Sequence, residues 1–88
     1  DNVEAIRLVR QAAEQGLANA QIDVGWLYRD VLEDFVRAHM WFNLAAAQGH
    51  VGAMNQREQV QDRMTPQQIA KAQEMATRCF QSNYSDCD

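Results

Sequence analysis

The feature that most limits what this chain can fold into is an internal repeat with a period of 33 residues. When residues 1–20 are laid over residues 34–53, identical residues meet at Asp1/Asp34, Val3/Val36, Ala5/Ala38, Ala12/Ala45, Ala13/Ala46, Gln15/Gln48, Gly16/Gly49 and Ala20/Ala53. In each copy the apolar residues recur at three- and four-residue spacing, which predicts an amphipathic helix, and a glycine then ends it. A repeat of this length indicates a helix hairpin that buries its apolar face only when copies stack.

The local signals divide the chain into helices and give almost no sign of a strand. The pattern predicts helices over about 2–15, from about 18 through Tyr28, and over about 35–48, 52–63 and 66–80, followed by an irregular tail over 82–88. Thr65 suits the N-cap of the last helix, Pro66 its first position, and Gln68 can close a capping box. Asp1 or Asn2 can cap the first helix. We expect its buried face to comprise Ala5, Leu8, Val9, Ala12 and Ala13.

The connection between the second and third helices allows two folds. After a tight turn, Asp30 could cap a new helix, with Glu33 as its capping-box partner. Alternatively, residues 18–48 could form one rod about 45 Å long, because a helix rises 1.5 Å per residue. Its two halves could then pair only with a second chain, in a domain-swapped dimer. Within the second helix, Gly25 costs about 1 kcal/mol relative to alanine. It is either a tolerated defect or a site of close packing against another helix, and we favour the packing.

Composition excludes several classes of function. The formal net charge is −4, whereas a surface for nucleic acid or anionic membranes needs clustered lysine and arginine. No apolar run approaches the roughly 20 residues of a membrane-spanning helix. His39 and His50 have no cysteine or carboxylate at the close spacing of a metal site, and no catalytic nucleophile motif is recognisable. We therefore expect no metal, no cofactor and no enzymatic activity.

Two groups of residues together resemble the Sel-one-like repeat (SLR), a relative of the tetratricopeptide repeat, in its bacterial form. The first comprises Ala38, Trp41, Phe42, Ala45, Ala46, Gln48, Gly49 and Ala53; the second comprises Ala20, Gln21, Val24, Gly25, Leu27 and Tyr28. The resemblance implies an all-α, α/α superhelical solenoid. Its repeats would span about 1–30 and 34–64, and a capping helix and tail about 65–88.

The chain departs from the family pattern in two places. The family normally places a Gly-x-Gly loop between repeats, but here Tyr28-Arg29-Asp30 runs directly into Val31-Leu32-Glu33-Asp34. In addition, Arg57-Glu58 stands where the family has Leu-Gly. The first departure keeps the fused rod open as an alternative. The second suggests that the second repeat is the last and is sealed by a polar face.

The resemblance implies a protein–protein interaction module, a scaffold or adaptor, without catalysis. The alternatives are an enzyme-like or cell-wall-associated role in the periplasm, and a structural homodimer. A protein or peptide partner would lie on the concave face of the solenoid. The first helices of the repeats and the capping helix would line that face with Arg7, Arg10, Gln11, Glu14, His39, Met40, Asn43, Ala47, Gln73, Glu74, Thr77 and Arg78. The alternative for each of these residues is an ordinary solvated helix face.

The two cysteines, Cys79 and Cys87, also allow two interpretations. They could be a buried thiol at Cys79 and an unrelated thiol at Cys87, or a disulfide that joins the tail to the last helix. Cysteine pairs at this spacing occur in cysteine-rich members of the family, so we expect the disulfide. It would imply an oxidising compartment, periplasmic or extracellular; free thiols would instead indicate the cytoplasm.

Overall fold

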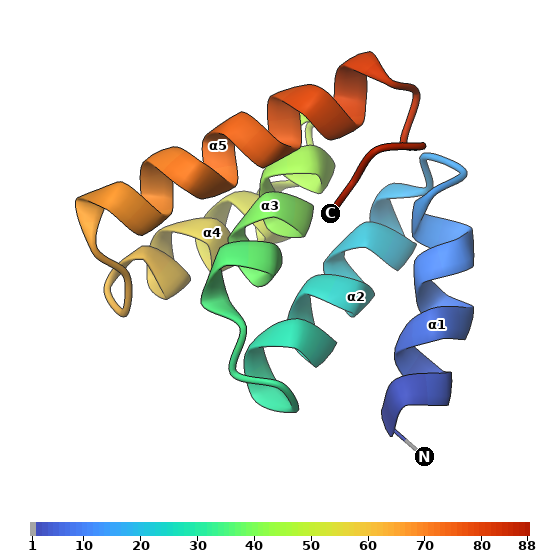
Figure 1. Ribbon diagram of the computed structural model, residues 1–88, viewed down its shortest axis with the longest axis horizontal. Coiled ribbons are helices and arrows are strands. Elements are labelled where there is room, and N and C mark those ends of the chain that lie inside the picture. Colours follow the sequence, from blue (N-terminus) through green and yellow to red (C-terminus); the bar gives the residue numbers. More distant parts are fainter. Residues whose placement is uncertain (1) are drawn as a thin grey trace.

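Every regular element within residues 2–88, the part of the chain that the computed structural model describes, is a helix. The helices are α1 (Asn2–Ala13), α2 (Ala18–Asp30), α3 (Phe35–Ala47), α4 (Val51–Gln61) and α5 (Pro66–Gln81) (Figure 1). The all-α prediction is thereby confirmed. The prediction that Asp1 could cap α1, and the pair Asp1/Asp34, fall on a residue outside the described range.

Helices α2 and α3 are separate, so the fused rod over 18–48 is wrong. The predicted cap was also misplaced, because Asp34 rather than Asp30 caps α3 by accepting a hydrogen bond from the backbone N–H of Arg37 (3.1 Å). The chain reverses without glycine because Glu33 adopts a left-handed conformation, with φ of 51°. The backbone N–H of Asp34 then donates to the carbonyl of Tyr28 (2.9 Å), which closes the turn. A homodimer stays a prediction.

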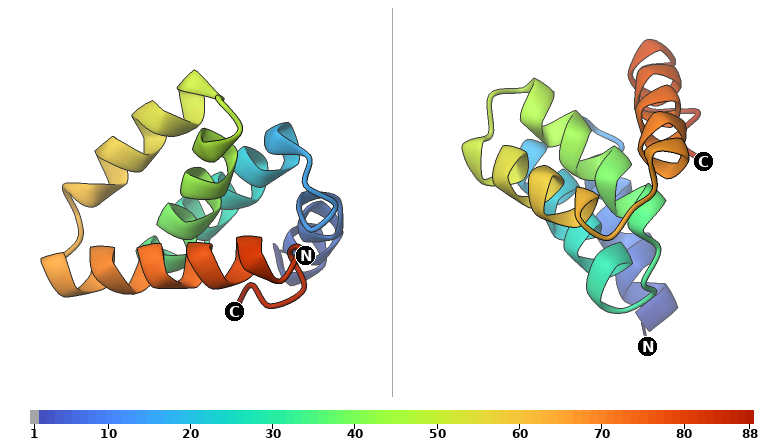
Figure 2. Two further views of the ribbon diagram at one scale, coloured as in Figure 1. Left: turned by 90° about the horizontal axis from the view of Figure 1, so that it is seen from above. Right: turned by 90° about the vertical axis from the view of Figure 1, so that its left-hand side faces the viewer.

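Helix α3 lies at the centre of the fold and packs against α2, α4 and α5 (Figures 1 and 2). Helices α4 and α5 diverge from the turn that joins them, with α3 between them (Figure 2). Trp41 and Phe42 have no exposed surface. A Cβ on Gly25 of α2 would lie 2.5 Å from the ring of Phe42, which confirms the expected close packing at that glycine. The glycine therefore lets α2 approach the ring of Phe42.

Helix α1 buries less than the sequence pattern predicted. Ile6 and Ala13 are buried and Val9 is half-buried, but Ala5 is exposed and Leu8 is 52% exposed. The reason is position, because α1 packs mainly against α2 and presents its other side to solvent. An apolar periodic pattern marks a face that can be buried, and a neighbouring element is still needed to bury it.

Glutamine side chains form hydrogen bonds that link the ends of α1 and α3. The buried side chain of Gln21 donates to the carbonyl of Ala13 (3.2 Å). Gln48 donates to the carbonyl of Gly16 (2.8 Å) and to Oε1 of Gln21 (3.0 Å). Gly16 and Gly49 both follow their helices in the left-handed conformation, at φ of 85° and 89°. The two repeat copies therefore end alike and are held together at those ends.

The start of α5 follows its sequence signal. Thr65 Oγ1 accepts a hydrogen bond from the N–H of Gln68 (3.1 Å), and the side chain of Gln68 accepts one from the N–H of Thr65 (2.9 Å). This confirms the predicted capping box. It fixes where α5 begins, and thus which of its residues face α3.

Candidate protein-binding surface

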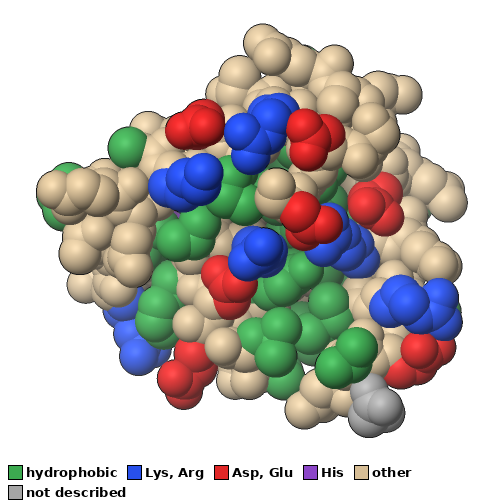
Figure 3. All heavy atoms as spheres, in the orientation of Figure 1, with side chains coloured by type: hydrophobic (Ala, Val, Ile, Leu, Met, Phe, Trp, Pro, Cys, Tyr) green, Lys and Arg blue, Asp and Glu red, His purple; other side chains and the backbone are tan. Residues whose placement is uncertain are grey.

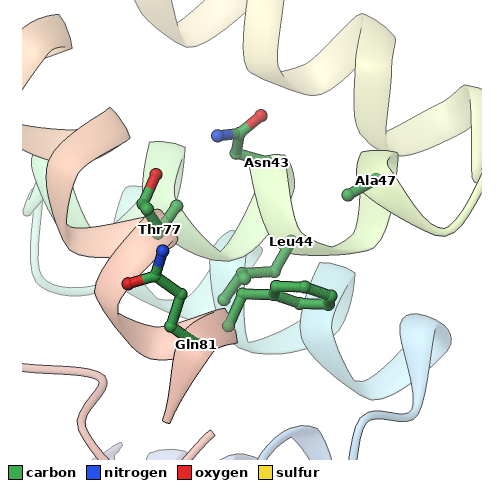
Figure 4. A pocket seen from close by; sticks show the side chains of 7 residues that line it. Asn43, Leu44, Ala47, Thr77 and Gln81 are labelled. Atoms are coloured by element: carbon green, nitrogen blue, oxygen red, sulfur yellow. The ribbon is translucent and has the colours of Figure 1, made fainter. Parts of the chain in front are cut away.

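A pocket of about 320 Å3 opens between the C-terminal halves of α3 and α5 (Figure 4). It is lined by Asn43, Leu44, Ala47, Ala76, Thr77, Phe80 and Gln81. Leu44 and Ala76 are buried, whereas Phe80 is 62% exposed. Polar groups of the lining come from Asn43, Thr77 and Gln81. The pocket is therefore mainly apolar with a few polar groups, the usual composition of a binding site.

The side chain of Asn43 is fixed from outside the pocket. Arg57 of α4 donates a hydrogen bond to its Oδ1 (2.7 Å). Figure 4 shows the amide nitrogen of Asn43 on the side that faces Thr77. Because the oxygen accepts from Arg57, the NH2 group of Asn43 is left on the pocket side as a hydrogen-bond donor.

Asn43, Ala47 and Thr77, which the sequence assigned to one row, line the pocket together. Gln73 and Glu74 are exposed on α5 but lie outside its lining. Arg7, Arg10, Gln11 and Glu14 belong to α1 and the turn after it and do not reach the pocket. Arg7 pairs with Glu4 on its own helix, and Gln11 is exposed.

The prediction that His39 and Met40 line a binding face is wrong, because both are completely buried. Nε2 of His39 lies 2.9 Å from Nε2 of Gln61, which places the imidazole against α4. Burial, reinforced by the charge of Arg57, lowers the pKa of His39 to about 4. The imidazole is therefore neutral at physiological pH and belongs to the core.

Four lining residues of the pocket were not predicted for the binding face, namely Leu44, Ala76, Phe80 and Gln81. Leu44 and Ala76 are one helical turn or less from Asn43 and Thr77, so a search for apolar residues beside the predicted row could have found them. Phe80 is the last residue of the helix predicted over 66–80, and nothing in the sequence shows directly that its ring is exposed. The available signal was a large aromatic residue next to the predicted row.

The sulfur atoms of Cys79 and Cys87 lie at disulfide-bonding distance, and both residues are buried. This agrees with the predicted pairing of the tail with α5. Between residues 2 and 88, no three or more histidine, cysteine or acidic side chains gather as metal ligands would. None of the helices in that range combines the length and hydrophobicity needed to cross a bilayer.

Comparison with known proteins gives one match. The sequence fits the family model of the Sel1 repeat over residues 1–17 and again over residues 18–50. The second of these spans contains α2 and α3, the two helices that meet at Gly25 and Phe42. No curated protein and no solved structure matches the chain.

Proposed function

The chain belongs to the Sel1 repeat family, and we propose on that premise that it is a non-catalytic module that binds a partner protein through the pocket between α3 and α5. Sel1 repeats are generally protein–protein interaction modules. The observation that carries the proposal for this chain is the apolar pocket with the exposed ring of Phe80 beside it.

The size and lining of the pocket suit one apolar anchor side chain. Leu44 and Ala76 would contact that side chain, and Phe80 would lose exposed surface when the partner covers it. Buried anchors of this kind carry most of the binding free energy at protein interfaces. The NH2 group of Asn43 would donate to a backbone carbonyl beside the anchor, which would set the direction of the bound chain.

The chemistry of the lining supports binding over catalysis. None of the seven lining residues carries a group that titrates near neutral pH. Enzymatic sites usually gather titratable groups with shifted pKa values in their clefts. His39, whose pKa burial lowers strongly, is in the core and is not part of the pocket lining.

The pairing of Cys79 with Cys87 supports an oxidising location. Disulfides persist in the periplasm and outside the cell, whereas cytosolic reductants keep thiols reduced. We therefore propose that the module works in one of these oxidising compartments.

The pocket can be tested by filling it without disturbing the core. Ala47 is exposed and lines the pocket, so Ala47→Arg should occupy it with a long side chain. Ala70 is an exposed alanine on α5 outside the lining, so Ala70→Arg is a matched control. Peptides selected from a displayed random library on the wild-type protein supply the ligands, and isothermal titration measures their affinities.

We expect Ala47→Arg to weaken the selected peptides at least about tenfold, while Ala70→Arg changes their affinity less than about twofold. NMR titration of the wild type should shift the methyl signals of Leu44 and the ring signals of Phe80. Equal losses in the two variants, or peptide-induced shifts confined to residues outside the pocket, would contradict the proposal.

A further inference from the structure

The tail, residues 82–88, folds back from the end of α5 and lies against α1 and α3 (Figure 1). Asn83 and Tyr84 reverse its direction in left-handed conformations, at φ of 56° and 65°. The ring of Tyr84 lies against Gly16, where an added Cβ would be 3.1 Å from it. Cys87 joins the tail to Cys79 of α5. The tail therefore connects the last helix with the first.

Three arginines from three different helices meet the acidic residues of this tail. Oδ1 of Asp88 lies 2.8 Å from a guanidinium nitrogen of Arg10 in α1 and 3.7 Å from Nε of Arg37 in α3. Oδ2 of Asp86 lies 3.5 Å from Nε of Arg78 in α5. We call Arg10, Arg37 and Arg78 the three-arginine surface. Figure 3 shows basic and acidic side chains interleaved across the centre of the face seen in Figure 1.

The helices hold two of these arginines in place independently of the tail. The guanidinium of Arg10 lies 5.9 Å from the centre of the Trp41 ring and donates to the hydroxyl of Tyr28 (2.9 Å). Nε of Arg10 also lies 3.5 Å from a carboxylate oxygen of Glu14, and with the tail in place the side chain of Arg10 is 18% exposed. Arg37 pairs with Asp34, the cap of its own helix (2.8 Å). Because both cations are already oriented, little conformational freedom is lost when a carboxylate arrives.

The contact is electrostatic and weak by itself. The hydrogen bond from Arg10 lowers the pKa of Asp88, so this carboxylate is ionised under all ordinary conditions. However, the side chains of Asp86 and Asp88 are both more than half exposed, and exposed ion pairs contribute little net stability. The covalent link at Cys87 adds to the packing of Tyr84 in keeping the tail on this surface, because it restricts a segment that already follows α5 and so raises the effective concentration of the two aspartates.

We propose that the three-arginine surface binds an extended acidic peptide segment of a partner, with two carboxylates spaced as in Asp86 and Asp88, and that the tail is a built-in competitor held by the disulfide. This surface is distinct from the pocket between α3 and α5, so the proposal does not depend on that pocket. Reduction by a dithiol breaks the bond between Cys79 and Cys87, adds two electrons and two protons to give two thiols, and oxidises the dithiol to its own disulfide. The reduced tail, still joined to α5 but less restricted, then competes less well with a separate acidic segment.

The probe is a labelled, acetylated and amidated pentapeptide, Tyr-Ser-Asp-Ser-Asp, which copies residues 84–88 with serine in place of Cys87. Fluorescence anisotropy measures its binding to the full chain in the oxidised form, after reduction with dithiothreitol, and in the Cys79→Ser/Cys87→Ser variant. We expect at least tenfold tighter binding to the last two forms than to the first. The peptide Tyr-Ser-Asn-Ser-Asn should bind at least tenfold more weakly.

The arginines are tested in the Cys79→Ser/Cys87→Ser background. Arg37→Gln should reduce the affinity for the acidic peptide about tenfold, whereas Arg7→Gln, on α1 but paired with Glu4, should leave it unchanged. A second variant, Asp86→Asn/Asp88→Asn with the disulfide intact, keeps the proposal testable if the reduced chain loses its fold by circular dichroism. It should bind the peptide several-fold more tightly than the oxidised wild type.

Two results would overturn the proposal. One is equal affinity for the aspartate and asparagine peptides, which would show that the carboxylates are not recognised. The other is an affinity that the disulfide and the Asp86/Asp88 substitutions leave unchanged, which would show that the tail does not compete. Binding through the pocket between α3 and α5 is measured separately with Ala47→Arg, so the failure of one proposal leaves the other intact.

Discussion

Helices α1 and α3 carry the same repeat pattern in very different surroundings. Trp41 of α3 is completely buried, whereas Leu8, which occupies the equivalent position in α1, is 52% exposed. Ala38 has no exposed surface, but its counterpart Ala5 is exposed. Helix α3 packs against three helices, while α1 packs mainly against α2. A repeat pattern thus specifies the helix, and its place in the stack decides how much of the helix is buried.

The largest difference should appear when both equivalent positions are truncated. Trp41→Ala should cost about 3–5 kcal/mol, because it leaves a large cavity in the core. Leu8→Ala should cost less than about 1 kcal/mol, because half of its side chain is already in water. Urea denaturation of the two variants measures both values. Similar losses would mean that α1 is buried in solution as deeply as α3, and the comparison would fail.

Ile6 of α1 and His39 of α3 occupy equivalent positions, and only the histidine can titrate. The free energy of unfolding should therefore depend on pH through His39 and not through Ile6. The folded pKa of His39, about 4, lies below its ordinary value of 6.5. Between these two pH values the unfolded chain binds a proton that the folded chain does not, so stability should fall as the pH drops from about 6.5 to about 4. The full loss would be about 3 kcal/mol, at 1.36 kcal/mol per pKa unit.

His39→Ile, which places the residue of the first copy in the second, should remove this part of the pH dependence. The measurement is the difference in unfolding free energy between wild type and variant at pH 7 and at pH 4.5. The pKa of Asp88 is lowered from its ordinary value of 3.8, so this carboxylate is protonated only below the pH range in which His39 acts. Parallel pH profiles for the two proteins would assign the dependence to other groups.

Loss of the disulfide should affect α1 more than α4. The chain-entropy estimate for so short a loop is about 2–3 kcal/mol of total stability. The tail contacts Arg10 of α1 and Gly16 just after it, and none of the contacts described for the tail reaches α4. Hydrogen exchange of Cys79→Ser/Cys87→Ser should therefore show faster exchange across α1 than across α4, relative to wild type. Uniform acceleration would mean that the tail stabilises the whole chain without preference.

The smallest and sharpest test uses the two equivalent glycines. Gly49→Ala should cost about 1–2 kcal/mol, because alanine resists the left-handed conformation and nothing else is crowded there. Gly16→Ala carries the same cost and also pushes Tyr84, which should add roughly 0.5 kcal/mol. The added cost should disappear in the Cys79→Ser/Cys87→Ser background, where Tyr84 can move away. A double-mutant cycle by thermal or urea unfolding measures it.

Features of the fold that depend on local forces were predictable from the sequence. The end of α1 near Gly16, the end of α3 near Gly49 and the start of α5 at Thr65 depend on backbone conformation and capping within a few residues, and all three are placed close to their predicted positions. The turn between α2 and α3 was harder, because a non-glycine residue, Glu33, adopts the left-handed conformation. Propensity alone does not indicate such a residue.

The site residues were harder still, because they depend on which helices meet. His39 and Met40 lie beside the apolar face of α3 in sequence, and only the packing around them shows that they are buried. Asn43 and Thr77 were predicted in one row, and the angle between α3 and α5 brings them together in the pocket. The pairing of Asp88 with Arg10 joins residues near opposite ends of the chain, and no periodicity in the sequence signals it.

The contact between the tail and α1 has a consequence for cooperativity. A linear array of repeats is stabilised by intrinsic and nearest-neighbour terms, so its terminal unit can fray without opening the rest. Here Asp88 and Tyr84 connect the last segment of the chain with α1 and the turn after it, so the order of contacts forms a ring. The tail thus closes the order α1, α2, α3, α5 into a ring, in which neither α1 nor α5 is terminal, whereas α4 packs on α3 outside the ring. Unfolding should therefore be closer to all-or-none with the tail in place, and should approach the behaviour of a linear array once the tail is released.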